Sequence, residues 1–234
     1  MFGAARRRLV EQLRECVKRN DPRIAIGIEW ISDNTAQHAD FIHSVSGYCQ
    51  AVNDWQRGQK PRFADFIDLF RYTFPEITLS DREIRDDTDI PRRVNHALLK
   101  GLISDVEIYR CRATIAETPI YAAYLKDANA LRARQSRFLL AGTYRDTLGF
   151  TIDNDEIEAR CFVSGNRMAV VMTQSHLGEA TTALTVPGFR VIDTDGLGEY
   201  TAEPSEGGAR VTLKRHALAV LIAEKLDAAP IGEG

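Results

Sequence analysis

The residues best suited to chemistry are acidic, basic and aromatic side chains that follow short apolar runs of the sequence. Cleavage of a glycosidic bond needs two carboxyl groups, one to protonate the leaving oxygen and one to attack the sugar or activate water. Aromatic faces flanked by Arg or Asp suit a sugar ring and its hydroxyl groups. We therefore predict Glu29 as a catalytic acid. The residues predicted to bind substrate are Trp30, Asp33, Arg71, Tyr72, Glu76 and Asp105.

Each of these residues also has a purely structural explanation. A carboxylate such as Glu29 could form an ordinary ion pair at a strand end, although buried strands seldom end in a carboxylate without a partner. Trp30 could pack against the next helix, and Arg71 could form a structural salt bridge. Glu76 could simply end its loop, and Asp105 could lie on the polar face of a strand. The residue types alone leave these alternatives open.

Three strand–helix units are expected to position these side chains. The predicted strands are 23–29, 66–72 and 104–109, and the predicted helices are 3–19, 33–44, 91–102 and 119–139. The helices follow from apolar residues at a spacing of three and four, and the strands from short apolar runs. In a (β/α) barrel the carboxyl ends of the strands form the active site. We therefore expect Glu29 and the other candidates to share one rim.

The pattern changes after about residue 150 to short strands separated by glycine, proline and polar turns. The predicted strands are 156–163, 167–173, 182–186, 189–193, 209–213 and 217–224. Six short strands at this spacing are typical of a small antiparallel β-sandwich. The fold class is therefore α/β followed by all-β, with a partial barrel over residues 1–148 and a sandwich over 149–234.

Composition narrows the possible functions. The formal net charge is −3 and 44% of the residues are hydrophobic, so neither nucleic acid nor a membrane is an expected partner. The four cysteines show no CxxC spacing, and His38 and His43 would lie on different faces of a helix, so no metal site is expected. The sequence also lacks GxSxG, P-loop and GxGxxG motifs, and no cofactor is implied.

Several stretches resemble the C-terminal half of bacterial (β/α)8-barrel glycoside-hydrolase-like proteins close to the retaining α-glycosidases. The stretches are Ile26–Trp30 with Asp33, Asp40–His43, Phe70–Glu76, Asn95–Leu102 and Asp105–Glu107. The resemblance covers roughly residues 3–150, and the sandwich resembles these proteins only in type. It implies that the three strands are the sixth, seventh and eighth of the barrel. It also implies a general acid/base on the sixth strand, where Glu29 falls, and a nucleophile on the fourth.

The expected function is thus the C-terminal portion of a retaining carbohydrate hydrolase whose nucleophile lies upstream of Met1. Such a portion would leave open strand edges, so a complementing chain or a homo-oligomer is an expected partner besides the carbohydrate. The alternative is a non-catalytic carbohydrate-binding or assembly module, in which a loop carrying Tyr48 and Trp55 contacts a glycan. The localisation stays open, and it is cytoplasmic if Met1 is the true start, since no signal peptide follows it.

Overall fold

The computed structural model describes residues 2–29, 31–43, 64–82, 84, 86–109, 111–174 and 178–226. Contacts divide the chain into two units. The first unit comprises Met1–Arg93 and Lys100–Ala122, and the second comprises Val94–Leu99 and Ala123–Gly234. No helix among the described residues is long and apolar enough to cross a membrane. The expected domains, 1–148 and 149–234, stay a prediction.

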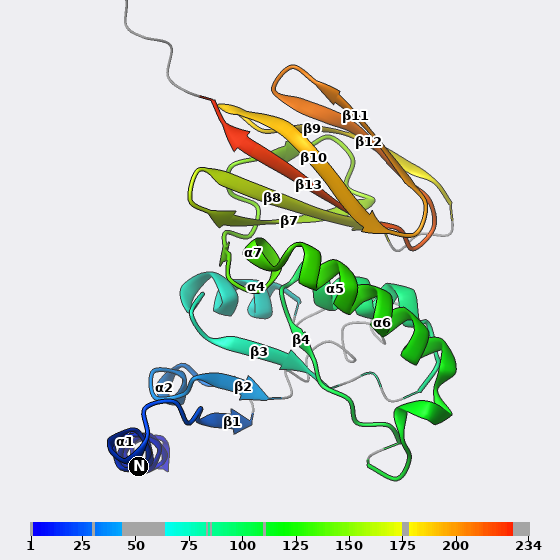
Figure 1. Ribbon diagram of the computed structural model, residues 1–234. Helices are drawn as coiled ribbons and strands as arrows, with labels where there is room; N and C mark the ends of the chain where they lie inside the picture. The colour runs from blue at the N-terminus through cyan, green and yellow to red at the C-terminus, as the bar shows by residue number, and fades with distance from the viewer. Residues whose placement is uncertain are drawn as a thin grey trace, which may run out of the picture. The chain divides into compact units, whose positions relative to one another are not determined.

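The first unit contains a four-stranded sheet in which the strands follow chain order and run parallel (Figure 1). The strands are β1 Gly27–Glu29, β2 Phe41–His43, β3 Thr78–Asp81 and β4 Ile103–Ser104. The helices that begin in this unit are α1 Phe2–Asn20, α2 Asp33–Ala36, α4 Ala64–Thr73, α5 Ile90–Leu99, η1 Ile115–Glu117 and α6 Pro119–Arg134. Among the described residues, strand β1 pairs with β2 and with no other strand, so it forms one edge of the sheet that the structure describes.

The predicted strand 66–72 is wrong, because this run belongs to helix α4. Ile67 and Phe70 are buried and Leu69 is 62% exposed, which is the spacing of a helix face rather than the alternation of a strand. A short apolar run fits either element when read by itself. Two candidate site residues, Arg71 and Tyr72, therefore lie on a helix and not at the end of a strand.

The predicted helix 33–44 is also wrong beyond its first turn. Helix α2 ends at Ala36, and the chain then forms strand β2, whose central residue Ile42 is completely buried. The third predicted strand, 104–109, is displaced as well, since β4 ends at Ser104 and the following residues form a loop. Over the described ranges of the first unit, the sheet therefore has four parallel strands where three were expected.

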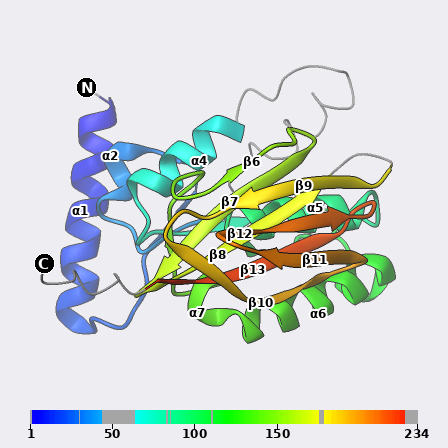
Figure 2. The ribbon, with the colours of Figure 1, turned by 90° about the horizontal axis from the view of Figure 1, so that it is seen from above.

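The second unit contains two antiparallel sheets that lie in two layers (Figures 1 and 2). Their orders are β10-β13-β8-β7-β5 and β11-β12-β9-β6. The elements are α7 Ser136–Leu139, β5 Thr143–Tyr144, β6 Thr151–Ile152, β7 Ile157–Ser164, β8 Arg167–Gln174, β9 Ala180–Thr185, β10 Phe189–Leu197, β11 Tyr200–Ser205, β12 Gly208–Leu213 and β13 Leu218–Lys225.

One apolar core lies between these sheets. Val170 and Leu221 enter it from the first sheet, and Leu184 and Val211 from the second. This arrangement follows from strands that alternate between buried and exposed side chains, as in β9. The predicted antiparallel sheets after residue 150 are therefore confirmed.

Candidate functional site

The carboxyl ends of the parallel strands bring the candidate site together. Glu29 is the last residue of β1 and is in register with His43, the last residue of β2. Asp81 ends β3, and Asp105 follows β4 directly. Because the strands are parallel, these positions share one edge of the sheet, which we call the carboxyl edge.

Arg82 joins two carboxylates at the carboxyl edge. Its Nη2 atom donates to Oε1 of Glu29 at 2.5 Å, and its Nε atom lies 3.0 Å from Oε2 of Glu107. The Glu29 side chain is 48% exposed, whereas that of Glu107 is only 14% exposed. Burial lowers the pKa of Arg82, but the hydrogen bond to Glu29 and the charges of the nearby carboxylates raise it more. A guanidinium ion therefore links a half-exposed carboxylate to a largely buried one.

A second cluster at the same edge is centred on Asp105. Its carboxylate contacts Nδ1 of His43 and accepts a hydrogen bond from the Ser80 hydroxyl at 3.4 Å. The backbone N–H of Asp105 donates to the carbonyl oxygen of Asp81 at 2.9 Å, which fixes the loop against β3. A carboxylate on one ring nitrogen of a histidine orients the ring and leaves the other nitrogen for a ligand.

Strand β1 is held in place at its other end by Asp40. The Asp40 carboxylate accepts hydrogen bonds from the backbone N–H of Ile26 at 2.8 Å and from Arg14 at 3.0 Å, and it pairs with Lys18 at 2.9 Å. Burial raises the pKa of Asp40, but the contacts with Lys18, Ile26 and Arg14 outweigh burial and lower it to about 2. These contacts tie α1 to the residue that precedes β1 and so help to position Glu29 at the far end of the strand.

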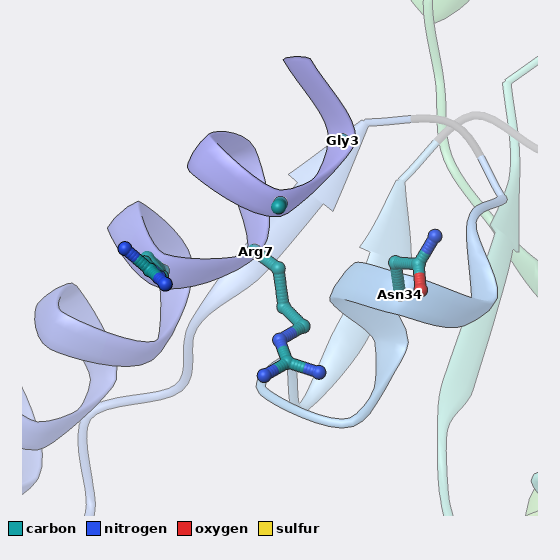
Figure 3. Close-up of a pocket in the computed structure, with 5 residues that line it drawn as sticks. Gly3, Arg7 and Asn34 are labelled. Atoms are coloured by element: carbon teal, nitrogen blue, oxygen red, sulfur yellow. The ribbon is translucent and has the colours of Figure 1, made fainter. Parts of the chain in front are cut away.

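Arginines of α1 lie beside the carboxyl end of β1. Arg6 donates to the carbonyl oxygen of Glu29 at 3.4 Å. Arg7 and Arg8, together with Gly3, Ala4 and Asn34, line a pocket of about 380 Å³. Figure 3 shows the side chain of Arg7 extending between α1 and α2. Two arginines therefore give this pocket a positive charge.

The structure brings together only part of the predicted site. Glu29 and Asp105 lie at the carboxyl edge, and Asp33 is exposed in the first turn of the helix that follows β1. Trp30 lies outside the described residues, as does the loop that carries Tyr48 and Trp55. Of the predicted site residues that the structure describes, Glu29 and Asp105 therefore lie at the carboxyl edge itself.

The other three predicted residues lie before β3 rather than after a strand. Arg71 is buried on α4 and donates to the carbonyl oxygen of Ile77 at 2.9 Å, directly before β3 begins. Tyr72 is exposed on α4, and Glu76 is exposed in the turn between α4 and β3. The prediction that Arg71, Tyr72 and Glu76 follow a strand is wrong, because it depended on the strand 66–72.

Sequence reasoning missed four residues of the carboxyl edge, namely His43, Asp81, Arg82 and Glu107. A signal for two of them was present, since the apolar residues Ile77 and Leu79 end in Asp81 and Arg82 much as Ile28 ends in Glu29. His43 falls within the predicted helix 33–44, so its position at the end of a strand was not expected. Within the part of the chain that the structure describes, no three His, Cys, Asp or Glu residues are grouped so that they could hold a metal ion.

Comparisons with known proteins show the fold of the chain. No protein-family model and no curated protein matches the sequence. Among solved structures, an alpha-amylase from Geobacillus thermoleovorans complexed with acarbose superposes with a TM-score of 0.60 and 14% identity, over 94% of this chain and 58% of that one. An Anoxybacillus alpha-amylase gives 0.58 and 13% over 95% and 57%. A debranching enzyme from Nostoc punctiforme gives 0.57 and 14% over 90% and 54%.

These similarities show that the chain shares its fold with part of the alpha-amylase and debranching-enzyme structures that it matches. The expected resemblance to such proteins is confirmed, with mixed helices and parallel strands followed by antiparallel sheets. The chain spans less than two thirds of the length of the structures that it matches. At these identities the likeness concerns the fold, and the chemistry has to be argued from the residues of this chain.

Proposed function

We propose that the chain is the C-terminal portion of a carbohydrate-active hydrolase that cleaves O-glycosidic bonds with retention. Glu29 serves as the general acid/base, and the nucleophile is a carboxylate outside this sequence. The observation that carries the proposal is the position of Glu29 at the carboxyl edge of a parallel sheet, in a fold shared with glycoside hydrolases. In a fold of this kind that edge is where active sites are built.

We also infer that β1 to β4 are four strands of a (β/α)8 barrel. All four are parallel and follow chain order, as the strands of such a barrel do. In the part of the chain that the structure describes, strand β1 has a neighbour on one side only. Leu9 and Leu13 of α1 are 66% and 51% exposed. Further strand–helix units beside β1, from a longer polypeptide or a complementing chain, would cover both features.

The number of strands changes the argument for Glu29. If β4 is the last strand of the barrel, β1 is the fifth rather than the sixth. The position on the sixth strand, which the resemblance implied, therefore no longer supports Glu29. Its assignment rests on its own geometry, a half-exposed carboxylate at the carboxyl edge.

The neighbours of Glu29 form a polar site beside the proposed acid. Arg82 contacts both Glu29 and Glu107, so it retains a carboxylate partner when Glu29 becomes protonated. Asp105 orients His43 beside Glu29, and Asp33 lies in the helix that follows β1. In the proposed site these side chains bind the hydroxyl groups of the sugar.

A second candidate function is a non-catalytic carbohydrate-binding or assembly module. The double contact of Arg82 favours it, because the Glu29 carboxylate is already satisfied by a guanidinium ion, as in a structural ion pair. A module would bind oligosaccharide through the same polar edge without cleaving it. Binding that persists in Glu29→Gln, with no hydrolysis by the wild type, would distinguish the module from the enzyme.

The enzymatic function is tested by introducing Glu29→Gln into the longest polypeptide that contains this sequence and measuring hydrolysis. We expect kcat on maltotetraose to fall by about 10²–10⁴-fold, the usual contribution of a general acid. A nitrophenyl glycoside should lose far less, because its leaving group needs little protonation. Glu76→Gln, which removes an exposed carboxylate before β3, is the matched control and should keep wild-type turnover. Unchanged kcat in Glu29→Gln would refute the assignment.

A further inference from the structure

The loop that follows β4 presents an aromatic ring to solvent. Tyr109 is 50% exposed, and Val106, three positions earlier in the same loop, is 43% exposed. The backbone of Tyr109 has a φ of 44°, in the left-handed region that bulky side chains rarely adopt. Cys111, two residues further on, has a φ of 61°. Strained backbone of this kind persists where the surrounding structure holds it, and it is frequent at binding sites.

The residues before Tyr109 fix the loop to the carboxyl edge. Ile108 is 1% exposed and anchors the loop in the apolar interior. Glu107 contacts Arg82, which in turn contacts Glu29. Two residues of extended chain span at most about 7 Å, so the backbone of Tyr109 lies within that distance of the backbone of Glu107. The loop that carries the exposed ring therefore contacts, through Glu107, the same charged residues that hold the proposed acid.

We propose that Tyr109 is a sugar-stacking residue that binds one pyranose ring of the substrate beside Glu29. The proposal rests on the proposed function and adds a substrate contact to it. A pyranose presents an apolar face of C–H groups, and a tyrosine ring offers a flat apolar face with a polar tip. A tyrosine also gives a large contact area at a low cost in conformational entropy, because only two χ angles have to be fixed.

Tyr72 provides a matched control for Tyr109. Single exposed aromatic residues are ordinary on protein surfaces, so exposure does not make a site. Tyr72 is 41% exposed, close to the value for Tyr109, but it lies on α4 near the start of β3. The two tyrosines differ in their attachment to the charged network and in the backbone strain, which is found at Tyr109.

The experiment follows ¹³C-labelled tyrosine rings by NMR while maltotetraose, cellotetraose and xylotetraose are added to the whole chain. The ring signals of Tyr109, assigned by their loss in Tyr109→Phe, should shift with at least one sugar. Tyr109→Ala should weaken that binding by about tenfold, as expected for the loss of one aromatic contact. Tyr109→Phe should bind within about threefold of the wild type, because the ring face remains. Tyr72→Ala should bind like the wild type.

Two results would overturn the proposal. One is that the Tyr109 signals respond to none of the three sugars. The other is that Tyr109→Ala binds as tightly as the wild type, with circular dichroism showing the same fold. A Tyr109 response together with unchanged hydrolysis in Glu29→Gln would refute the proposed acid and leave the stacking contact standing. The experiments can therefore refute the role of Tyr109 without refuting that of Glu29, and the reverse.

Discussion

At the scale of single residues, charge pairing organises the carboxyl edge. Arg82 connects Glu29 to Glu107, and Asp105 connects His43 to Ser80. The Arg82 guanidinium compensates the charges of Glu29 and Glu107, which would otherwise repel each other at a crowded strand end. The side chains at this edge are thus ordered before a ligand binds, which lowers the conformational entropy lost on binding.

Asp40 should make the stability of the first unit depend on pH. Its folded-state pKa of about 2 lies below its ordinary value of 3.8, so the contribution of its carboxylate is complete above about pH 4 and is lost as the pH falls through 2. We expect Asp40→Asn to lower the free energy of unfolding at pH 7 by about 1–2 kcal/mol, because hydrogen bonds to a charged acceptor are lost.

Urea unfolding followed by circular dichroism measures this effect. The difference between wild type and Asp40→Asn should shrink between pH 4 and pH 2. Asp33→Asn, a change at an exposed aspartate of α2, is the control and should leave stability unchanged. A difference that stays constant with pH would contradict the role given to Asp40.

Glu29 and Asp105 were predictable because each ends or follows a short apolar run, and that pattern depends only on local sequence. Arg82 and Glu107 were not, because Arg82 contacts Glu29 from more than fifty positions away along the chain, and Glu107 joins the site through Arg82. His43 shows the same limit, since its partner Asp105 belongs to another strand–loop segment. Residues that act through long-range pairs leave little local signal.

At the scale of elements, helix α4 shows why a short apolar run is ambiguous. Asp68 lies within this run, and a polar residue between apolar ones reads as the outward face of a strand. In the structure Asp68 is instead buried, with its Oδ2 atom 2.5 Å from Nζ of Lys100, which is itself 0% exposed. The tertiary partner thus overrides the local pattern, and the helix turns Asp68 inward.

The Asp68–Lys100 pair gives a test of this packing. Lys100→Met should destabilise the first unit by about 3–5 kcal/mol, because it leaves a buried carboxylate without its ammonium partner. The double variant Asp68→Asn with Lys100→Met should be less destabilised than the sum of the single variants. Urea unfolding measures all three. Arg23→Met is the control, because the Arg23 side chain is 88% exposed and the loss of its pair with Asp21 should change stability by less than about 1 kcal/mol. Additive effects would show that the two groups are not coupled.

At the scale of the whole molecule, the two units differed in how well sequence predicts them. The strands of the second unit alternate between buried and exposed residues and are separated by turn residues, so their pattern is local. The strands of the first unit are two to four residues long, and short runs of that kind carry little periodicity. Even so, the α/β class of the first unit followed from the alternation of apolar runs and helices.

We propose that the chain binds carbohydrate at the carboxyl edge of β1 to β4. Hydrogen exchange of the whole chain with and without maltotetraose tests this directly. We expect protection to appear in segments 26–29, 41–43, 79–82 and 103–109. Protection confined to residues 71–78 would contradict it. So would protection confined to a pocket of about 480 Å³ in the second unit, which is lined by Thr147, Phe150–Ile152 and Ile157–Arg160.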